Sequence, residues 1–476
     1  MAQTIGRAPI PVHGGAAPRY APAMNRSKGV LLSLLLVWLP VARAVAQDEL
    51  VRSLDDDKLV ALVAKLRPAV EQACGRTFAK APQVYVSDQG ELKRVMRVEL
   101  APQVEAFYRG NPRNRIQKAL QMRADLSASG LLGKFVFESG EVLVVPPLVK
   151  TMLDLLGMHD ADADAVLQLV VMHELVHALQ EQEVGLGARF AKLENLAAVE
   201  SLNLLAEGHA VFCSERAARA LGLGGAVAPV RAIFRGRTDS FDTVAVGLHG
   251  RRSERRGEVV YLRGAAIVER AFERGGVDAT WELLAGGASC VELLRGDGEQ
   301  VAQVEDASAS VAALREQFAG KTWTVGVGPI SPVQLVIENF HMRDSLVQLF
   351  AGWRRGAEWF AMAPTPAAWR AVYAFGFADE QAATRFVGVV AAGVSRDPEK
   401  TGERPEFADG PAIDGGACVR ASQERSWTQP GVEVLLFRRG ANVVQVTTCN
   451  ADAEDEELVR CAESVLKELE RLDDDR

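Results

Sequence analysis

One pentapeptide, HELVH at residues 173–177, constrains this chain more than any other feature of its sequence. It lies inside an apolar run, from Val166 to Leu179, which contains no glycine or proline and therefore predicts a buried helix. Two histidines four residues apart on a helix project from the same face, about one turn apart. Because burial of three ionisable groups is costly unless they are paired or bound to a metal, we expect His173, Glu174 and His177 to form a site.

The spacing of the two histidines favours a zinc site. Two imidazoles one turn apart can bind one Zn²⁺, and Glu174 between them then lies beside the open coordination position. The alternative is an ordinary core helix whose histidines bond to backbone carbonyls. The chain contains only seven histidines, so composition alone would give this pentapeptide in roughly one such chain in a hundred. We therefore favour the zinc site.

A catalytic zinc site needs a third protein ligand, because its fourth position is left to water. Glu207 is the strongest candidate. It lies in LLAEGHA at residues 204–210, on a second predicted helix that spans about residues 193–221. The thirty residues from His177 to Glu207 are enough to end one helix, cross a loop at residues 185–187 and return antiparallel.

Two other residues on this second helix compete for the role of third ligand. Glu200 lies seven residues before Glu207 and shares its face. It can act as the ligand or as a carboxylate that orients a zinc-bound histidine. His209 is a competent ligand, but a residue two positions on points to nearly the opposite side of the helix. We rank Glu200 second and His209 third.

Together these segments resemble the gluzincin metallopeptidases, in which a glutamate on the helix after the HExxH helix completes the zinc site. The resemblance implies that His173, His177 and Glu207 hold Zn²⁺, which polarises the scissile carbonyl and acidifies a water. It also implies that Glu174 takes the proton of that water and passes it to the leaving amine. Gly208, next to Glu207, would let the helices approach closely.

The sequence departs from two known patterns. The metzincin continuation is excluded, because Gln180 and Glu183 stand where it would place glycine and histidine. Thermolysin-like gluzincins carry an aspartate four residues after the glutamate ligand, where it orients a histidine. That position is Val211 here, so the orienting group must come from elsewhere or differ in kind.

A third segment adds to the resemblance. The sequence VVYLRGAAIV at residues 259–268 opens another predicted apolar helix. Gluzincin aminopeptidases have a similar Tyr-x-Lys-Gly segment downstream of the glutamate ligand. Tyr261 falls at the matching place, with Arg263 where lysine usually stands, so the resemblance implies that its hydroxyl donates a hydrogen bond to the developing oxyanion. The alternative is a tyrosine that packs its ring at a helix start.

Length and patterning predict an α+β chain of two domains. We expect a mainly helical zincin-like metallopeptidase domain with a small edge hairpin at residues 47–300, a polar linker at 301–332 and a smaller α+β C-terminal domain at 333–476. In gluzincins a strand at the place of the hairpin lines the cleft and pairs with an extended peptide, although a plain hairpin is equally compatible. The elements expected from these patterns are helices at 50–74, 92–126 with a break at 110–112, 379–390 and 452–472, a strand at 84–86, the edge hairpin at 135–137 and 142–145, a strand at 369–375 and a second hairpin at 432–437 and 442–447.

Residues 1–46 are typical of targeting rather than of a folded domain. Residues 1–23 lack an apolar period and predict disorder. A secretory signal begins at Met24, with an apolar core from Gly29 to Leu39 and a cleavage site after Ala46. This core is too short to span a bilayer comfortably. We therefore expect an extracytoplasmic protein, periplasmic or secreted, without a stable membrane span after cleavage.

The mature chain is acidic. Five of the 54 basic residues lie in the leader, which leaves 49 against 62 acidic residues and a net charge of −13. This argues against nucleic acid as the main partner, and the basic cluster at residues 251–256 is predicted to be a solvated loop. The six cysteines match no zinc knuckle. Export permits disulfides, and Cys418, Cys449 and Cys461 are the candidates for a bridge near the C-terminus.

The sequence therefore predicts an exported zinc metallopeptidase that acts on a peptide or protein substrate. It lacks the Gly-x-Met-Glu-Asn segment with which many gluzincin aminopeptidases bind a substrate amine, and this favours endopeptidase action. Two alternatives stay open. One is a metallopeptidase-like binding or scaffold module, which the intact HELVH disfavours. The other is a zinc hydrolase of a non-peptide amide, such as a cell-wall linkage, which the sequence does not separate from a peptidase.

Overall fold

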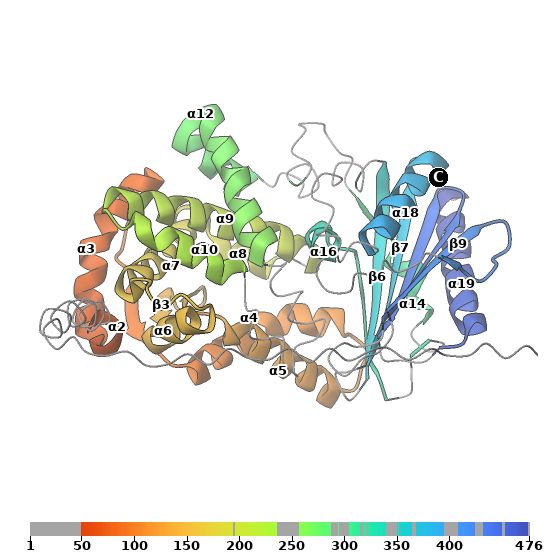
Figure 1. The fold of residues 1–476 in the computed structure, drawn as a ribbon, viewed down its shortest axis with the longest axis horizontal. Coiled ribbons are helices and arrows are strands. Elements are labelled where there is room, and N and C mark those ends of the chain that lie inside the picture. Colours follow the sequence, from red (N-terminus) through yellow and green to blue (C-terminus); the bar gives the residue numbers. More distant parts are fainter. Residues whose placement is uncertain are drawn as a thin grey trace, which may run out of the picture. The chain divides into compact units, whose positions relative to one another are not determined.

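A computed structural model describes residues 49–193, 196–235, 257–286, 294, 304–314, 318–319, 322–338, 350, 352–363, 368–394, 408–423, 432–449 and 453–474. The first part of the chain is mainly helical with a small sheet, and a sheet-rich part follows from residue 304 (Figure 1). This agrees with the predicted order of a helical region and an α+β region. The helices of the first part are α2 (Glu49–Ser53), α3 (Asp56–Cys74), α4 (Gln89–Phe107), α5 (Arg113–Ser129), α6 (Pro146–Leu155), α7 (Ala163–Val184), α8 (Leu186–Ala191), α9 (Leu196–Ala220), η1 (Gly224–Ala226), α10 (Val227–Arg235), η2 (Glu258–Arg263) and α12 (Gly264–Gly286).

The helix predicted around the pentapeptide is α7, and local sequence accounts for both of its ends. Asp162 caps the start, where its side chain accepts a hydrogen bond from the Ala165 N–H group at 2.9 Å. Gly185 ends the helix in the left-handed conformation, with φ 59°, which glycine adopts without strain. Between these caps the helix is buried on nearly every side. The two histidines are therefore held by a core helix, as predicted.

The second predicted helix is α9, which packs against α3, α7 and α12. Gly208 permits a close approach, as expected, but its partner is the start of α12 rather than α7. A Cβ atom at Gly208 would lie 2.2 Å from the backbone carbonyl carbon of Gly264, and one at Gly264 would lie 2.4 Å from the Leu204 carbonyl oxygen. The absence of side chains at these two glycines thus allows the start of α12 to contact α9 next to Glu207.

The small sheet contains the predicted hairpin. Strand β2 (Gly133–Val136) pairs antiparallel with β3 (Glu141–Val144), and β1 (Gln83–Val86) pairs parallel with β3 on the other side. Gly140 occupies the turn with φ 73°. Since the strand order is β1-β3-β2, β2 is an edge strand. It packs against α7 and so lies beside the pentapeptide.

The second part of the described chain is built on an eight-stranded sheet with the order β4-β6-β7-β11-β10-β9-β8, in which β5 also pairs with β6. Helix α19 packs on one face, where Leu466 and Val465 join the core around Trp359. Helix α18 packs on the other, where Phe386 contacts Phe375. The elements are β4 (Glu305–Asp306), α14 (Ser308–Ala312), β5 (Thr324–Gly328), α16 (Pro332–Glu338), β6 (Trp353–Met362), β7 (Trp369–Phe377), α18 (Glu380–Val394), β8 (Ala408–Asp409), β9 (Ala417–Gln423), β10 (Val432–Arg439), β11 (Asn442–Cys449) and α19 (Asp455–Asp474).

Residues 301–332 are not a simple linker, which corrects our prediction. Strand β4 pairs parallel with β6, and β5 pairs antiparallel with it. Both strands therefore belong to the second sheet. The two glycines of β5 made this segment resemble a loop in the sequence. Glycine is required at position 326, because a Cβ atom there would lie 2.0 Å from the Phe107 ring. Asn111 also holds β5, since its amide donates to the Val325 carbonyl at 2.6 Å and accepts from the Val325 N–H group at 2.9 Å.

The predicted bridge near the C-terminus is not formed. In the described part of the chain, no disulfide joins Cys418, Cys449 and Cys461, and they lie on β9, β11 and α19. Cys418 is opposite Phe437 and Cys449 is opposite Val432, so these two cysteines lie near opposite ends of β10.

Several predictions concern residues outside the described ones. These are the disordered segment and signal sequence expected at residues 1–46, and the solvated basic loop expected at 251–256. Among the helices of the described ranges, none is both long and apolar enough to cross a membrane.

Candidate metal centre

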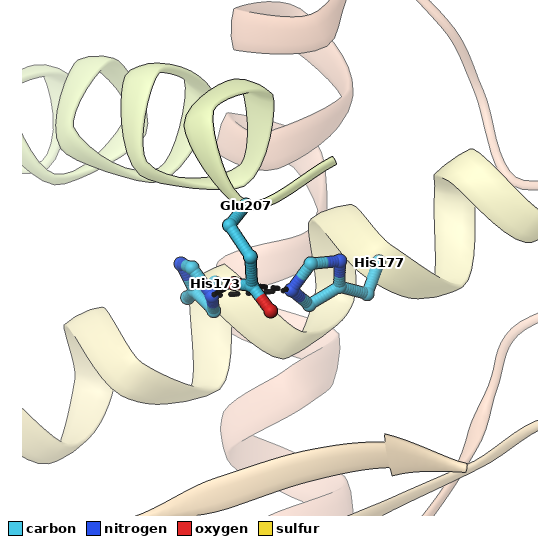
Figure 2. A group of neighbouring side chains, drawn as sticks. All are labelled: His173, His177 and Glu207. Carbon is cyan, nitrogen blue, oxygen red and sulfur yellow. Dashed lines mark hydrogen bonds and ion pairs between the residues drawn. The ribbon is translucent and has the colours of Figure 1, made fainter. Parts of the chain in front are cut away.

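Three side chains from α7 and α9 converge on one point (Figure 2). His173 Nε2 lies 3.1 Å from Glu207 Oε2, His177 Nε2 lies 3.2 Å from the same oxygen, and the two Nε2 atoms are 3.1 Å apart. Both histidines rise from one face of α7, and Glu207 reaches them from α9 (Figure 2). Within the described ranges, these three form the group of ionisable side chains that can hold a metal ion. The sequence had singled out all three.

The triangle of ligand atoms has the size that a metal ion requires. A tetrahedral ion with bonds of roughly 2.0–2.1 Å holds its ligand atoms about 3.3 Å apart. The three separations here run from 3.1 to 3.2 Å. Two imidazoles and one carboxylate supply three ligands, which leaves a fourth position for water or substrate and is the pattern of catalytic rather than structural sites.

Burial and close contact shift the pKa values of His177 and Glu207 in opposite directions. Burial disfavours the imidazolium form of His177, but the Glu207 carboxylate, together with Glu174 and Gln180, outweighs burial and raises the pKa of His177. Burial likewise opposes ionisation of Glu207, yet the neighbouring His177 and His173 lower the pKa of this carboxyl well below its usual range. Glu207 is therefore an anion at neutral pH, which is the form that binds a cation.

Glu174 points from α7 toward the edge strand β2. Its Oε2 atom accepts a hydrogen bond from the Phe135 N–H group at 2.7 Å, and the residue is buried. Gly133 makes room for it, because a Cβ atom there would lie 2.9 Å from Glu174 Cγ and 3.2 Å from Val170 Cγ1. The strand thus fixes the carboxylate that the sequence predicts as the base.

Tyr261 lies beside His173. Its ring centroid is 6.1 Å from that of His173, and its ring stacks on Phe234 with a centroid distance of 4.3 Å. Tyr261 belongs to η2, a six-residue π-helix that leads into α12 at Gly264. Such π-helical turns are rare and occur frequently at functional sites. The structure therefore brings the ring to the site, while the role of its hydroxyl stays a prediction.

Neither rival takes the place of Glu207. Glu200 is buried and lines the same cavity as the triad, but it is not one of the three converging groups. His209 packs against Trp281, with ring centroids 4.6 Å apart, and its Nδ1 atom lies 3.1 Å from the Gln180 amide nitrogen. This placement agrees with the predicted ranking of the three candidates.

The site opens into a cavity of about 1230 Å³. The five predicted site residues line it, and most of its wall is apolar, with Met96, Leu126 and Ile233 as examples from α4, α5 and α10. Typical small-molecule pockets measure roughly 300–1,000 Å³. The cavity therefore has room for an extended ligand.

Two residues contact the site in ways that the sequence did not predict. Gln180 contacts His177, whereas the sequence marks it only as a departure from the metzincin pattern. Its signal was present, because residues three apart on a helix are neighbours. Phe234 reaches Tyr261 from a different helix, and no local pattern marks such a contact.

Comparison of the chain with protein-family models, with curated proteins and with solved structures finds no match.

Proposed function

We propose that the protein is a zinc metallopeptidase of gluzincin type, and that its predicted signal sequence exports it. The observation that carries this proposal is the convergence of His173 Nε2, His177 Nε2 and Glu207 Oε2, all within 3.2 Å of one another, on the wall of a large cavity. Two histidines and a glutamate are a known ligand set of catalytic zinc. Zn²⁺ bound there would supply Lewis acidity to a substrate carbonyl and to a water.

Glu174 is suited to move the protons of the reaction. The Phe135 N–H group holds its Oε2 atom, which leaves Oε1 to accept a proton from the attacking water. The water oxygen adds to the carbonyl carbon, and the same carboxyl then gives the proton to the amine nitrogen, which leaves as the C–N bond breaks. The hydrogen bond from Phe135 on β2 would thereby hold the Glu174 carboxylate in a fixed orientation toward the substrate.

Replacing Gly133 with alanine is expected to lower turnover by roughly tenfold to a hundredfold, because a displacement of about 1 Å at a reacting group can cost a hundredfold. The added methyl group would press on Glu174 but not on the three metal ligands, so zinc content should not change. Steady-state kinetics and elemental analysis measure the two effects.

Gly130→Ala is the matched control for this substitution. Gly130 lines the same cavity, but nothing lies within 4 Å of a Cβ atom built there. Turnover should therefore stay at the wild-type level. Equal turnover in the Gly133 and Gly130 variants would argue against the placement of Glu174.

Tyr261 supplies the second catalytic group of the proposal. Its ring is held between His173 and the stacked Phe234, and it lines the cavity. A phenol hydroxyl at this place would donate a hydrogen bond to the oxygen on which negative charge develops.

Tyr261→Phe is expected to lower kcat by on the order of a hundredfold, which is what loss of one oxyanion donor costs. Zinc content should stay the same, because the ring and its stacking on Phe234 remain. Tyr85→Phe is the control, because the Tyr85 side chain is exposed on β1 and does not line the cavity. A kcat within the error of wild type for Tyr261→Phe would remove the hydroxyl from the mechanism.

An extended peptide is the substrate that the cavity favours. The cavity is large and mainly apolar. Gly133 and Lys134 of β2 line it, and β2 is at the edge of the small sheet among the described strands. Part of that edge is already engaged, since Glu174 takes the Phe135 N–H group and the Lys134 ammonium donates to the Phe135 carbonyl. Pairing of the substrate backbone with β2 therefore stays a prediction.

A peptide-library digest tests the proposed function. Zinc-loaded protein is expected to cleave internal peptide bonds, to stop after chelation and to recover with one equivalent of zinc. Cleavage sites read by mass spectrometry also separate endopeptidase from exopeptidase action. Hydrolysis of cell-wall amides without peptide cleavage would favour the amidase alternative. Zinc binding without turnover of either substrate would favour a binding module.

A further inference from the structure

A buried hydrogen-bonded chain starts at His177 and leads away from the metal-binding face. His177 Nδ1 lies 2.8 Å from Gln180 Oε1. Gln180 Nε2 lies 2.9 Å from the Ala206 carbonyl oxygen and 3.1 Å from His209 Nδ1. Gln180 and His209 are both fully buried, so water does not compete for these contacts.

The Ala206 carbonyl determines how the Gln180 amide is oriented. A carbonyl oxygen accepts hydrogen bonds and cannot donate, so the NH₂ group of Gln180 must face Ala206. The amide oxygen of Gln180 then faces His177 Nδ1, and this nitrogen must carry the proton. In the neutral imidazole that binds a metal, His177 Nε2 then carries the lone pair, and this atom faces the metal site, 3.2 Å from Glu207 Oε2.

The far end of the chain agrees with this assignment. The Thr280 hydroxyl donates to the Val277 carbonyl at 2.7 Å, so its oxygen accepts from His209 Nε2, 3.3 Å away. His209 therefore carries its proton on Nε2, and its Nδ1 atom accepts from the second N–H of Gln180. In this series of hydrogen bonds, which runs from His177 on α7 to the Val277 carbonyl on α12, each donor therefore faces an acceptor.

We propose that Gln180 is a positioning residue that holds His177 in the tautomer needed to bind the metal, with His209 and Thr280 as its support. The inference rests on the metal site of the proposed function. Thermolysin-like gluzincins orient a histidine with an aspartate at the position that Val211 occupies here. In this chain the Gln180 amide, on α7, would orient the histidine instead. Being neutral, the amide orients the ring and adds no charge to it.

The two histidines are held differently. His173 Nδ1 is buried and has no hydrogen-bond partner among the described residues, whereas His177 Nδ1 is bonded to Gln180. Substitutions of Gln180 should therefore change zinc affinity strongly, because Gln180 maintains the tautomer of His177.

Zinc affinity of two Gln180 variants, measured by competition with a chelator, tests the proposal. Methionine fills a similar volume but accepts no proton from Nδ1, so Gln180→Met is expected to weaken zinc binding roughly 10–100-fold. Glutamate keeps an acceptor for Nδ1, so Gln180→Glu is expected to bind zinc much better than the methionine variant. Gln168→Met is the matched control on α7, where the amide bonds to the Asp164 carbonyl, and it should bind zinc like wild type.

A second measurement does not depend on how a variant folds. In zinc-loaded wild-type protein with ¹⁵N-labelled histidine, correlation of ring nitrogens with ring protons reports each tautomer. We expect His177 to carry its proton on Nδ1 and His209 to carry its proton on Nε2. The opposite tautomer at either residue would overturn the proposal.

The outcomes separate this inference from the proposed function. If wild type binds no zinc, both fail. If wild type binds zinc and Gln180→Met binds it equally well, the inference alone fails. A purely structural role for Gln180 would lower the melting temperature of both metal-free variants while leaving the zinc affinity of the folded protein unchanged, and that result would also overturn it.

Discussion

Replacing Glu174 with glutamine is expected to lower peptide hydrolysis by roughly 10²–10⁴-fold, the range that general acid–base groups contribute. Glutamine has nearly the same shape, and its amide oxygen can still accept the hydrogen bond from Phe135. It cannot take a proton from water at neutral pH. Zinc content, measured by elemental analysis, should therefore equal that of wild type while kcat collapses.

Glu181→Gln is the matched control for the loss of the base. Glu181 lies on the same helix and lines the same cavity, where it accepts a hydrogen bond from the Gly187 N–H group at 2.6 Å. A glutamine oxygen can keep that bond, so activity should persist. If Glu174→Gln and Glu181→Gln retain equal activity, Glu174 is not the base.

Replacing Glu207 with alanine is expected to weaken zinc binding on the order of a thousandfold. This estimate divides a binding free energy of roughly 10–16 kcal/mol, typical of structural zinc sites, among its ligands. The two histidines remain, but the anionic ligand that neutralises the cation is gone. Competition with a chelator measures the affinity, and hydrolysis should fall in parallel because less metal is bound.

Glu200→Ala tests the alternative ligand on the same helix. Glu200 is buried and lines the cavity, as the triad does, so the substitution removes a comparable carboxylate. Zinc affinity should match wild type, since Glu200 is not one of the converging groups. A larger loss of zinc in Glu200→Ala than in Glu207→Ala would reverse the assignment.

Most of the site could be predicted from patterns within short segments of the sequence. An unbroken apolar run predicts a buried helix, and a spacing of four residues places two histidines on one face. The choice between Glu207 and Glu200 was harder, because both lie on one face of α9. Their seven-residue separation is about 10 Å along a helix, so the position of α9 along α7 decides which carboxylate reaches the metal. Sequence alone does not give that position.

Contacts between distant segments account for the features that the sequence did not reveal. Strand β5 reads as a glycine-rich loop until Phe107 is seen to occupy the space above Gly326. The close approach of Gly208 to Gly264 likewise joins segments more than fifty residues apart. Gln180 is the exception, because its proximity to His177 follows from helical spacing. Only the orientation of its amide had to come from the structure.

The anomalous scattering of zinc-loaded crystals, recorded at the zinc absorption edge, tests the central claim most directly. We expect one peak per chain, at roughly 2.0–2.2 Å from His173 Nε2, His177 Nε2 and a carboxylate oxygen of Glu207. The absence of a peak there, or a peak held by Glu200 or His209 instead, would contradict the assignment of this site as a metal centre of the gluzincin kind.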